Sequence, residues 1–239
     1  MATSNDSQDF RYYFVLLSAA MIFVFSLENL NPNIADALSL GMSTLPQQPW
    51  SIVSYIFVHA NLSHIFSNLF AFIIFGFILE KIVGSRNFII IFFVTGIAAG
   101  IASLFFYPSV IGASGAIFGV MGAIVAIRPK MTVLAFGVPL PMVAAVVLWA
   151  ALDLGGVFYP SDVANIGHLG GLAAGIAIGL VLRPKYKLAE KKKDEMKFDE
   201  EYFKEWEKKY IEKNNYLMLK KRLFATGATA LYPCSSLSS

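Results

Sequence analysis

A serine and a distant histidine are the residues of this chain best suited to nucleophilic catalysis. Ser114 lies in the tetrapeptide Gly112-Ala113-Ser114-Gly115, at the expected start of an apolar helix. Backbone N–H groups at a helix start are unpaired, so they could stabilise an oxyanion formed when Ser114 attacks a carbonyl. A serine hydroxyl is a weak nucleophile and needs a base within hydrogen-bond reach. His168 is the candidate base, because we expect it on a neighbouring helix.

Two further polar residues have a spacing that suits an oxyanion hole. His64 and Asn68 are four residues apart, so both lie on one face of a helix. Both side chains carry N–H donors, which could stabilise an oxyanion together with the backbone N–H of Ser114. His59 comes five residues before His64 and lies off that face, so we expect it to anchor the preceding connection.

A third catalytic residue and a metal site have less support. Asp153 and Asp162 are the carboxylates nearest to His168 in the sequence. Neither position requires pairing with His168, so we predict a Ser–His dyad and keep assistance by an aspartate as the alternative. His59 and His64 lack the His-x-x-x-His spacing of ligands on one helix face, and no glutamate adjoins them. We therefore predict no metal and no cofactor.

The elements that position these residues are apolar helices. With 56% hydrophobic and 15% charged residues among 239, the chain is too apolar for an ordinary soluble domain. The apolar runs are continuous rather than alternating, which favours helices over a barrel. We predict an all-α membrane protein, a bundle of six transmembrane helices at 12–27, 64–80, 87–106, 114–127, 131–151 and 165–182. The fourth is short, so its start at Ser114 should lie below the outer membrane surface.

Basic residues alternate from side to side of these spans. They lie before the first span, after the second, after the fourth and after the sixth: Arg11, Lys81, Arg86, Arg128, Lys130 and fourteen more from Arg183 to Arg222. The connections 28–63, 107–113 and 152–165 contain none. The positive-inside rule therefore predicts a multi-pass protein of the cell membrane with both termini cytoplasmic. Ser114, His168, His64 and Asn68 should then lie near the extracytoplasmic side.

Small residues predict how three of the helices pack. Gly96 and Gly100, Gly115 and Gly119, and Gly171, Gly175 and Gly179 recur at a spacing of four. In lipid such residues let helix backbones approach closely. We expect the third, fourth and sixth helices to be neighbours, which would place Ser114 beside His168.

The chain should divide into four segments. We predict an N-terminal cytoplasmic segment at 1–11, a six-helix core at 12–183, a charged amphipathic cytoplasmic tail at 184–224 and a disordered end at 225–239. Phe198, Tyr202, Trp206 and Tyr210 recur every four residues in the tail. The net charge of +3 gives no argument for binding nucleic acid, because most of the charge is in this tail.

Together these motifs resemble those of the rhomboid family of intramembrane serine proteases, and in particular its prokaryotic members with a six-helix core. The resemblance covers residues 10–183. It rests on Trp50, His59-Ala-Asn-Leu-Ser-His64-Ile-Phe-Ser-Asn68, Glu80-Lys-Ile-Val-Gly84, Gly112-Ala-Ser114-Gly115 and Gly167-His168-x-x-Gly171-x-x-x-Gly175, in this order.

The resemblance implies a role for each of these residues. Ser114 would be the nucleophile and His168 the general base and acid, and the oxyanion hole would consist of His64, Asn68 and the Ser114 backbone N–H. Gly171 and Gly175 would let the sixth helix pack closely on the fourth. The partners would be the lipid bilayer and transmembrane protein substrates, cut near their outer ends at a site that opens to the extracytoplasmic side.

Two departures from the family pattern leave the dyad in place. Phe118 stands where many members have a tyrosine stacked on the catalytic histidine, and Ser51 replaces an arginine that often follows the loop tryptophan. The alternative is a catalytically inactive rhomboid-like protein that binds membrane helices, although such relatives typically lack the Ser or the His. A small transporter with a histidine relay would favour ionisable residues in mid-span and an internal repeat, and neither is visible.

Overall fold

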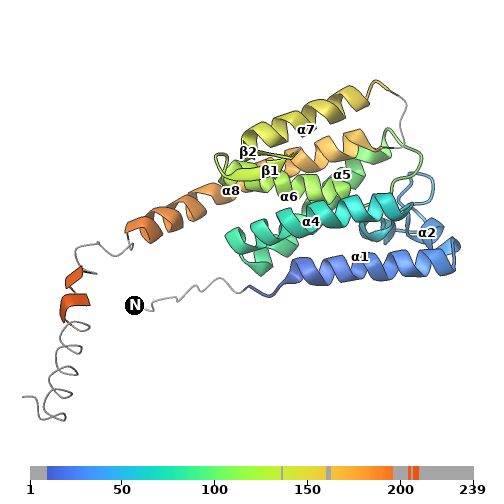
Figure 1. Ribbon diagram of the computed structural model, residues 1–239. Helices are drawn as coiled ribbons and strands as arrows, with labels where there is room; N and C mark the ends of the chain where they lie inside the picture. The colour runs from blue at the N-terminus through green and yellow to red at the C-terminus, as the bar shows by residue number, and fades with distance from the viewer. Residues whose placement is uncertain (1–9, 136, 160–162, 196–203, 206, 210–239) are drawn as a thin grey trace, which may run out of the picture. The chain divides into compact units, whose positions relative to one another are not determined.

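The computed structural model describes residues 10–135, 137–159, 163–195, 204–205 and 207–209, drawn as ribbon in Figure 1. The elements are α1 (Tyr13–Leu30), α2 (Asn33–Leu38), α3 (Ser51–Ser54), a 3-10 turn η1 (Tyr55–Phe57), α4 (Leu62–Val83), α5 (Ser85–Leu104), α6 (Ser114–Ile127), β1 (Thr132–Ala135), β2 (Val138–Pro141), α7 (Met142–Gly156) and α8 (Asn165–Glu195). The chain separates into two compact units, Met1–Leu188 and Ala189–Ser239. The first unit carries every candidate site residue. Most of the predicted tail and disordered end lies outside the described residues.

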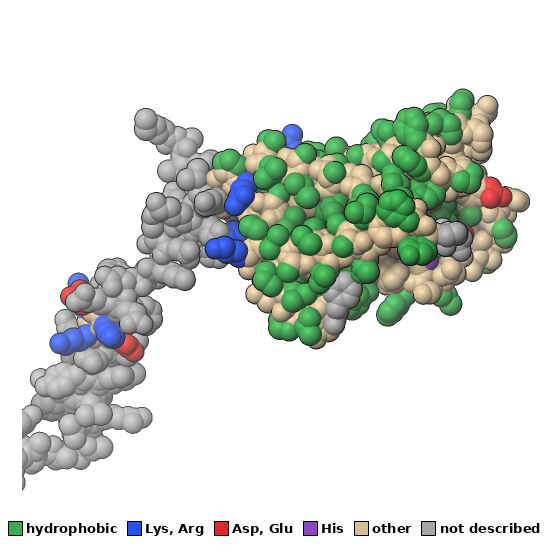
Figure 2. All heavy atoms as spheres, turned by 90° about the horizontal axis from the view of Figure 1, so that it is seen from above, with side chains coloured by type: hydrophobic (Ala, Val, Ile, Leu, Met, Phe, Trp, Pro, Cys, Tyr) green, Lys and Arg blue, Asp and Glu red, His purple; other side chains and the backbone are tan. Residues whose placement is uncertain are grey.

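The long helices are apolar on their outer faces as well as inside. Phe23, Phe66 and Phe70 are more than 60% exposed, and hydrophobic side chains cover much of the face drawn in Figure 2. A helix that is apolar all round suits a lipid environment. Among the described residues, four helices are long and apolar enough to cross a membrane: Tyr13–Leu30, Leu62–Val83, Ser85–Leu104 and Asn165–Tyr186. The described part of the chain is therefore mostly helical and membrane-embedded.

The short helix α6 is the centre of the bundle. It packs against α4, α5 and α7, and all but two of its 14 residues are buried. At about 1.5 Å per residue it is roughly 21 Å long, which is less than the ~30 Å hydrocarbon thickness. Because its neighbours cover it (Figure 1), its N-terminus can lie at membrane depth without exposing unpaired backbone groups to lipid.

The predicted helix at 131–151 was wrong in its first half, while the predicted fold of mostly helical elements stands. Residues 132–135 and 138–141 form two antiparallel strands, with Val133 paired to Leu140 and Ala135 to Val138. Gly137 turns the chain with φ of 80°. Proline lacks the N–H that a helix interior needs, so Pro139 and Pro141 prevent helix and α7 begins directly after them.

The connection between α1 and α4 is tied to the end of the bundle. Leu40 pairs with Val110 in an isolated antiparallel bridge. The Tyr55 hydroxyl donates to the carbonyl oxygen of Gly96 on α5 at 2.6 Å. The indole N–H of Trp50 donates to the carbonyl oxygen of Ala37 at 2.9 Å. These bonds hold the connection in place beside the loop that leads to α6.

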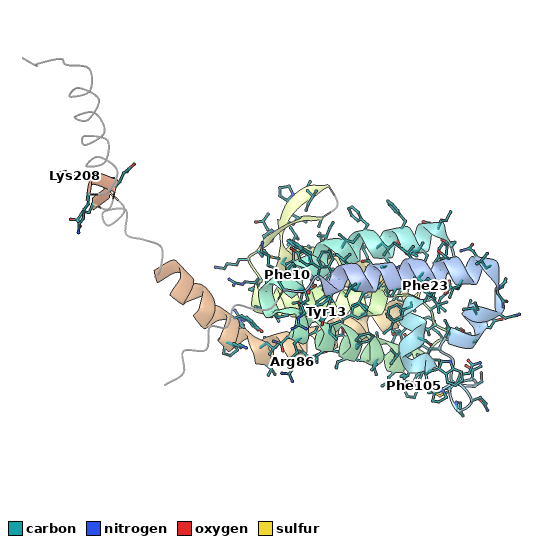
Figure 3. All side chains as sticks on the ribbon, turned by 90° about the horizontal axis from the view of Figure 1, so that it is seen from below. Phe10, Tyr13, Phe23, Arg86, Phe105 and Lys208 are labelled. Carbon is teal, nitrogen blue, oxygen red and sulfur yellow. The ribbon has the colours of Figure 1, made fainter. Side chains whose placement is uncertain are left out.

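A buried carboxylate organises the opposite end. Glu80, which is fully buried, accepts hydrogen bonds from the backbone N–H groups of Tyr13 and Phe14 at 2.9 and 3.0 Å and from the Ser85 hydroxyl at 2.5 Å. The first N–H groups of a helix have no partner within it, so Glu80 caps α1. Figure 3 shows Tyr13 at this end. Arg86 lies in the first turn of α5, and Phe105 follows the last residue of that helix. In Figure 2 the basic side chains of the first unit gather toward one end and a histidine is visible toward the other.

Candidate active site

The loop before α6 has a backbone shape that only glycine adopts easily. Gly112 has φ of 110°, and its N–H donates to the carbonyl oxygen of Tyr55 at 2.9 Å. A Cβ at this position would lie 2.8 Å from the imidazole of His64, so any side chain here would displace that ring. The chain then enters α6, whose first residue is Ser114. Ser114 therefore lies among the unpaired N–H groups of a helix start.

The structure brings together the serine and the histidine that the sequence singled out. The Oγ of Ser114 lies 2.7 Å from the Nε2 of His168, although the two residues are 54 positions apart. His168 lies in the first turn of α8, where its backbone N–H donates to the carbonyl oxygen of Ala164 at 3.2 Å. This distance lets the imidazole take the hydroxyl proton directly.

Glycines let α6 and α8 approach closely enough for that contact. A Cβ on Gly171 would collide with the carbonyl oxygen of Gly115, and a Cβ on Gly175 with that of Gly119. On the other side of α6, a Cβ on Gly115 would lie 2.5 Å from the Cβ of Ala99 on α5. The predicted packing of these helices is therefore present, and it leaves no room for larger residues.

An aromatic ring holds the imidazole in its plane. The rings of Phe118 and His168 are stacked, with centroids 4.5 Å apart and an interplanar angle of 9°. Phe118 lies one turn after Ser114 on α6, so one helix supplies both the hydroxyl and the stacking face. Stacking needs no hydroxyl, and phenylalanine is sufficient for it.

His168 has a second partner that the predicted dyad omits. Its Nδ1 lies 2.8 Å from the Oδ1 of Asp153, which is 7% exposed and lies in the last turn of α7. The sequence did not require this contact, and it corresponds to the alternative of an assisting aspartate. Asp162, the other carboxylate considered, lies outside the described residues.

His64 and Asn68 lie on the same face of α4 near Ser114. Asn61 caps this helix by accepting from the His64 N–H at 2.9 Å. The amide Nδ2 of Asn68 donates to the carbonyl oxygen of His64 at 2.8 Å. An amide nitrogen carries two hydrogens, so one donor remains after this bond. The Oδ1 of Asn68 is buried without a hydrogen-bond partner.

His59 packs behind His64 in the connection just before α4. It is 2% exposed, its backbone N–H donates to the carboxylate of Glu28 at 3.2 Å, and its ring centroid lies 5.1 Å from that of His64. Nδ1 lies 3.0 Å from the carbonyl oxygen of Phe57 and must carry the proton, because a carbonyl only accepts. Burial, with a smaller contribution from the neighbouring His64, lowers the pKa of His59 to about 4. His59 is therefore neutral at neutral pH, and these bonds anchor the connection.

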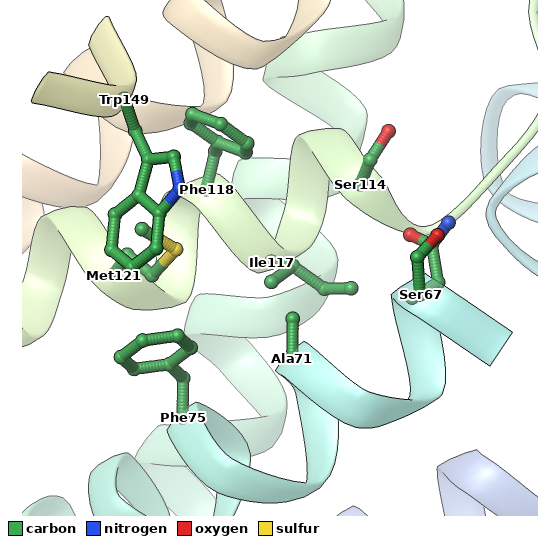
Figure 4. Close-up of a pocket in the computed structure, with 9 residues that line it drawn as sticks. Ser67, Ala71, Phe75, Ser114, Ile117, Phe118, Met121 and Trp149 are labelled. Atoms are coloured by element: carbon green, nitrogen blue, oxygen red, sulfur yellow. The ribbon is translucent and has the colours of Figure 1, made fainter. Parts of the chain in front are cut away.

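A cavity of about 170 Å³ adjoins Ser114. Phe75 of α4 and Trp149 of α7 lie at one end of it, with ring centroids 5.8 Å apart, and Ser67 and Ser114 lie at the other (Figure 4). The remaining lining residues are Asn68, Ala71, Ile117, Phe118 and Met121. The cavity is mostly apolar and lies among helices α4, α6 and α7, so its lining favours an apolar ligand.

The sequence profile of the Rhomboid domain matches residues 46–185, which is more than half of the chain. The chain belongs to the rhomboid family. This range contains the hydrogen-bonded Ser114 and His168, together with His64, Asn68 and Asp153.

Three relatives illustrate the range of similar proteins. The rhomboid is 31% identical over 189 residues to Rhomboid protease GluP of Bacillus subtilis, covering 74% of this chain and 36% of that protein. It is 29% identical over 157 residues to RHOMBOID-like protein 1 of Arabidopsis thaliana, covering 63% and 39%. It is 28% identical over 133 residues to Rhomboid protease GlpG of Haemophilus influenzae, covering 55% and 69%. The chain therefore spans little more than a third of the first two relatives.

The sequence held one signal that would have identified the second partner of His168 in this rhomboid. The predicted fifth span ended at residue 151, which left Asp153 in a connection, whereas α7 continues to Gly156. Asp153 is the only ionisable residue of this helix. An ionisable residue within a membrane helix is expected to have a partner and a function. Among the described residues, no group of three or more His, Cys, Asp or Glu side chains could hold a metal ion.

Proposed function

We propose that this rhomboid is an intramembrane serine endopeptidase that hydrolyses peptide bonds in or near the transmembrane helices of other proteins. The observation that carries the proposal is the 2.7 Å contact between the Ser114 hydroxyl and the His168 imidazole, beside an apolar cavity between helices. A nucleophile with a base in hydrogen-bond reach is the minimal machinery for acyl transfer. The names of the relatives GluP and GlpG, both called rhomboid proteases, support the same activity.

The proposed reaction passes through an acyl-enzyme. His168 takes the proton from Ser114 as the Oγ attacks the scissile carbonyl, and then gives it to the leaving amine. The Ser114 N–H, at the N-terminus of α6, together with the side chains of His64 and Asn68, stabilises the oxyanion. Water then attacks the ester, with His168 again acting as base, and releases Ser114.

The proposed orientation places the site on the extracytoplasmic side of the cell membrane. Basic residues flank the ends of α4 and α5 that lie away from His64, as at Lys81 and Arg86. The positive-inside rule makes that end cytoplasmic, together with both termini. In this arrangement α6 and α7 are the two short spans of a six-helix core, and substrate helices reach Ser114 from the lipid.

A fluorophosphonate probe tests the nucleophile. Such probes acylate activated serines, because attack needs a base next to the hydroxyl. We expect the purified protein to be labelled at one residue and the Ser114→Ala variant to lose all labelling. Ser109→Ala is the matched control, since Ser109 is an exposed serine in the loop that precedes α6. In-gel fluorescence and mass spectrometry of the labelled peptide measure the result, and labelling that persists in Ser114→Ala would contradict the proposal.

The oxyanion hole predicts a separate loss in the Asn68→Ala variant. Removal of one oxyanion donor lowers kcat by about 10²–10³-fold, so we expect this loss in cleavage of a single-span substrate with thermal stability nearly unchanged. Asn29→Ala is the control, because Asn29 makes the same bond to the carbonyl four residues earlier, at 2.7 Å, on an exposed face of α1. Equal turnover by the two variants would exclude Asn68 from the oxyanion hole.

A further inference from the structure

Asp153 and Ser114 occupy the two nitrogens of one imidazole. The Oδ1 of Asp153 lies 2.8 Å from Nδ1 of His168, and the Oγ of Ser114 lies 2.7 Å from Nε2. In a neutral imidazole one nitrogen donates and the other accepts. A carboxylate only accepts, so the Nδ1 of His168 carries the hydrogen in this arrangement. Nε2 is then the acceptor, so this tautomer of His168 is able to take the serine proton.

Burial of the Asp153 carboxylate is energetically unfavourable, and the contact with His168 is what compensates it. The side chains of His168 and Asp153 are only 12% and 9% exposed. Asp153 lies three residues before the end of α7, an otherwise apolar helix. A carboxylate is disfavoured both within an apolar membrane helix and near a helix C-terminus, where the dipole is negative. Its second oxygen, Oδ2, is buried without a hydrogen-bond partner, so Nδ1 of His168 is the group that compensates the burial.

The backbone of Asp153 holds the carboxylate against α8. Its carbonyl oxygen accepts from the Val157 N–H at 3.0 Å, so the residue is part of the regular last turn of α7. Stacking of Phe118 on His168 fixes the plane of the ring, and the bond to Asp153 fixes its rotation within that plane. The imidazole therefore has one orientation, with Nε2 toward Ser114.

We infer that Asp153 is a positioning residue that selects the Nδ1–H tautomer of His168 and stabilises its imidazolium, so that this rhomboid works with a Ser–His–Asp triad. This inference rests on the proposed function. As the Ser114 Oγ–carbon bond forms, the hydroxyl proton moves to Nε2 and the imidazole becomes cationic. As the peptide C–N bond breaks, that proton passes to the leaving amine. Asp153 keeps its charge throughout and makes no bond to substrate.

Turnover of the full-length protein tests the inference. We expect Asp153→Asn to lower kcat for a single-span substrate by about 10³–10⁴-fold. KM should remain within about twofold, because Asp153 does not touch substrate. The rate of fluorophosphonate labelling at Ser114 should fall in parallel, whereas Asp153→Glu should recover part of both rates. Asp36→Asn removes a carboxylate from the connection after α1 and serves as the control with unchanged rates.

The imidazole tautomer gives a readout that does not depend on proteolysis. Nitrogen-15 NMR of labelled histidine in the Ser114→Ala variant should show His168 as the Nδ1–H form. The additional Asp153→Asn change should populate the Nε2–H form. A purely structural aspartate would leave the tautomer unchanged. If Asp153→Asn does not fold, the tautomer in the Ser114→Ala variant still decides, and a predominant Nε2–H form there would overturn the inference.

The two proposals fail in different ways. Absence of labelling at Ser114 in the unmodified protein would refute the endopeptidase without reference to Asp153. Normal labelling and turnover in a folded Asp153→Asn variant would refute the triad and leave a Ser–His endopeptidase.

Discussion

Replacement of His168 with alanine should lower the turnover of a single-span membrane substrate by about 10⁴–10⁶-fold. The imidazole is 2.7 Å from the Ser114 hydroxyl and is the only base at this distance among the contacts of the described residues. Without it the serine keeps its proton and remains a weak nucleophile. Cleavage of a fluorescent substrate in vesicles measures the loss, and circular dichroism checks that the helices remain.

The control for this change is a second histidine that does not contact Ser114. His59→Ala removes a buried ring that holds the connection before α4. Loss of its buried hydrogen bond costs about 1–3 kcal/mol, so the midpoint of thermal unfolding should fall by about 2–12 °C. Turnover per folded molecule should remain within about tenfold. Comparable turnover in the two variants would mean that His168 is not the base.

Substitution of Gly175 with alanine should lower both the stability and the turnover of the protein. A Cβ there meets the carbonyl oxygen of Gly119 on α6, and neither backbone can move without moving its helix. Overpacking of this kind costs about 1–3 kcal/mol or more, which lowers the midpoint of unfolding by about 2–12 °C. The same displacement separates Ser114 from His168, and a misplacement of about 1 Å costs about 10²-fold in rate. Thermal unfolding followed by light scattering and turnover of the same sample measure both effects.

Gly155→Ala provides the matched control. Gly155 also lies in an apolar helix, α7, but a Cβ there has nothing within 4 Å. Alanine has the higher helix propensity, so this variant should be as stable as the unmodified protein or slightly more stable. Unchanged stability of Gly175→Ala would show that α8 does not depend on close approach to α6.

Local sequence determined the positions of the helices but not where one of them begins. Long apolar runs lie at all six predicted positions because hydrophobicity is a property of adjacent residues. At 131–151 the apolar composition hid a stronger signal, since Pro139 and Pro141 cannot lie in a helix interior and Gly137 favours a turn. The fifth helix therefore begins later and ends later than composition indicated.

The catalytic candidates were visible in the sequence to different degrees. Ser114 and His168 stand out because serine and histidine beside helix-packing glycines suggest a shared site, and those glycines do bring α6 against α8. The free donor of Asn68 could be anticipated only from its spacing to His64. Asp153 had no spacing motif, and its only signal was that it is the one ionisable residue of an apolar helix.

By itself, the sequence determined that this chain is a membrane protein of the rhomboid family, which helices it contains and which serine and histidine are candidates for chemistry. These properties depend on residue type and on spacing along one helix. The tertiary structure decided which nitrogen of His168 faces Ser114 and which carboxylate contacts its other nitrogen. It also decided how closely the loop at Gly112 approaches the ring of His64. Those contacts join α4, α6, α7 and α8, and distances between helices are set by packing in three dimensions rather than by any local pattern.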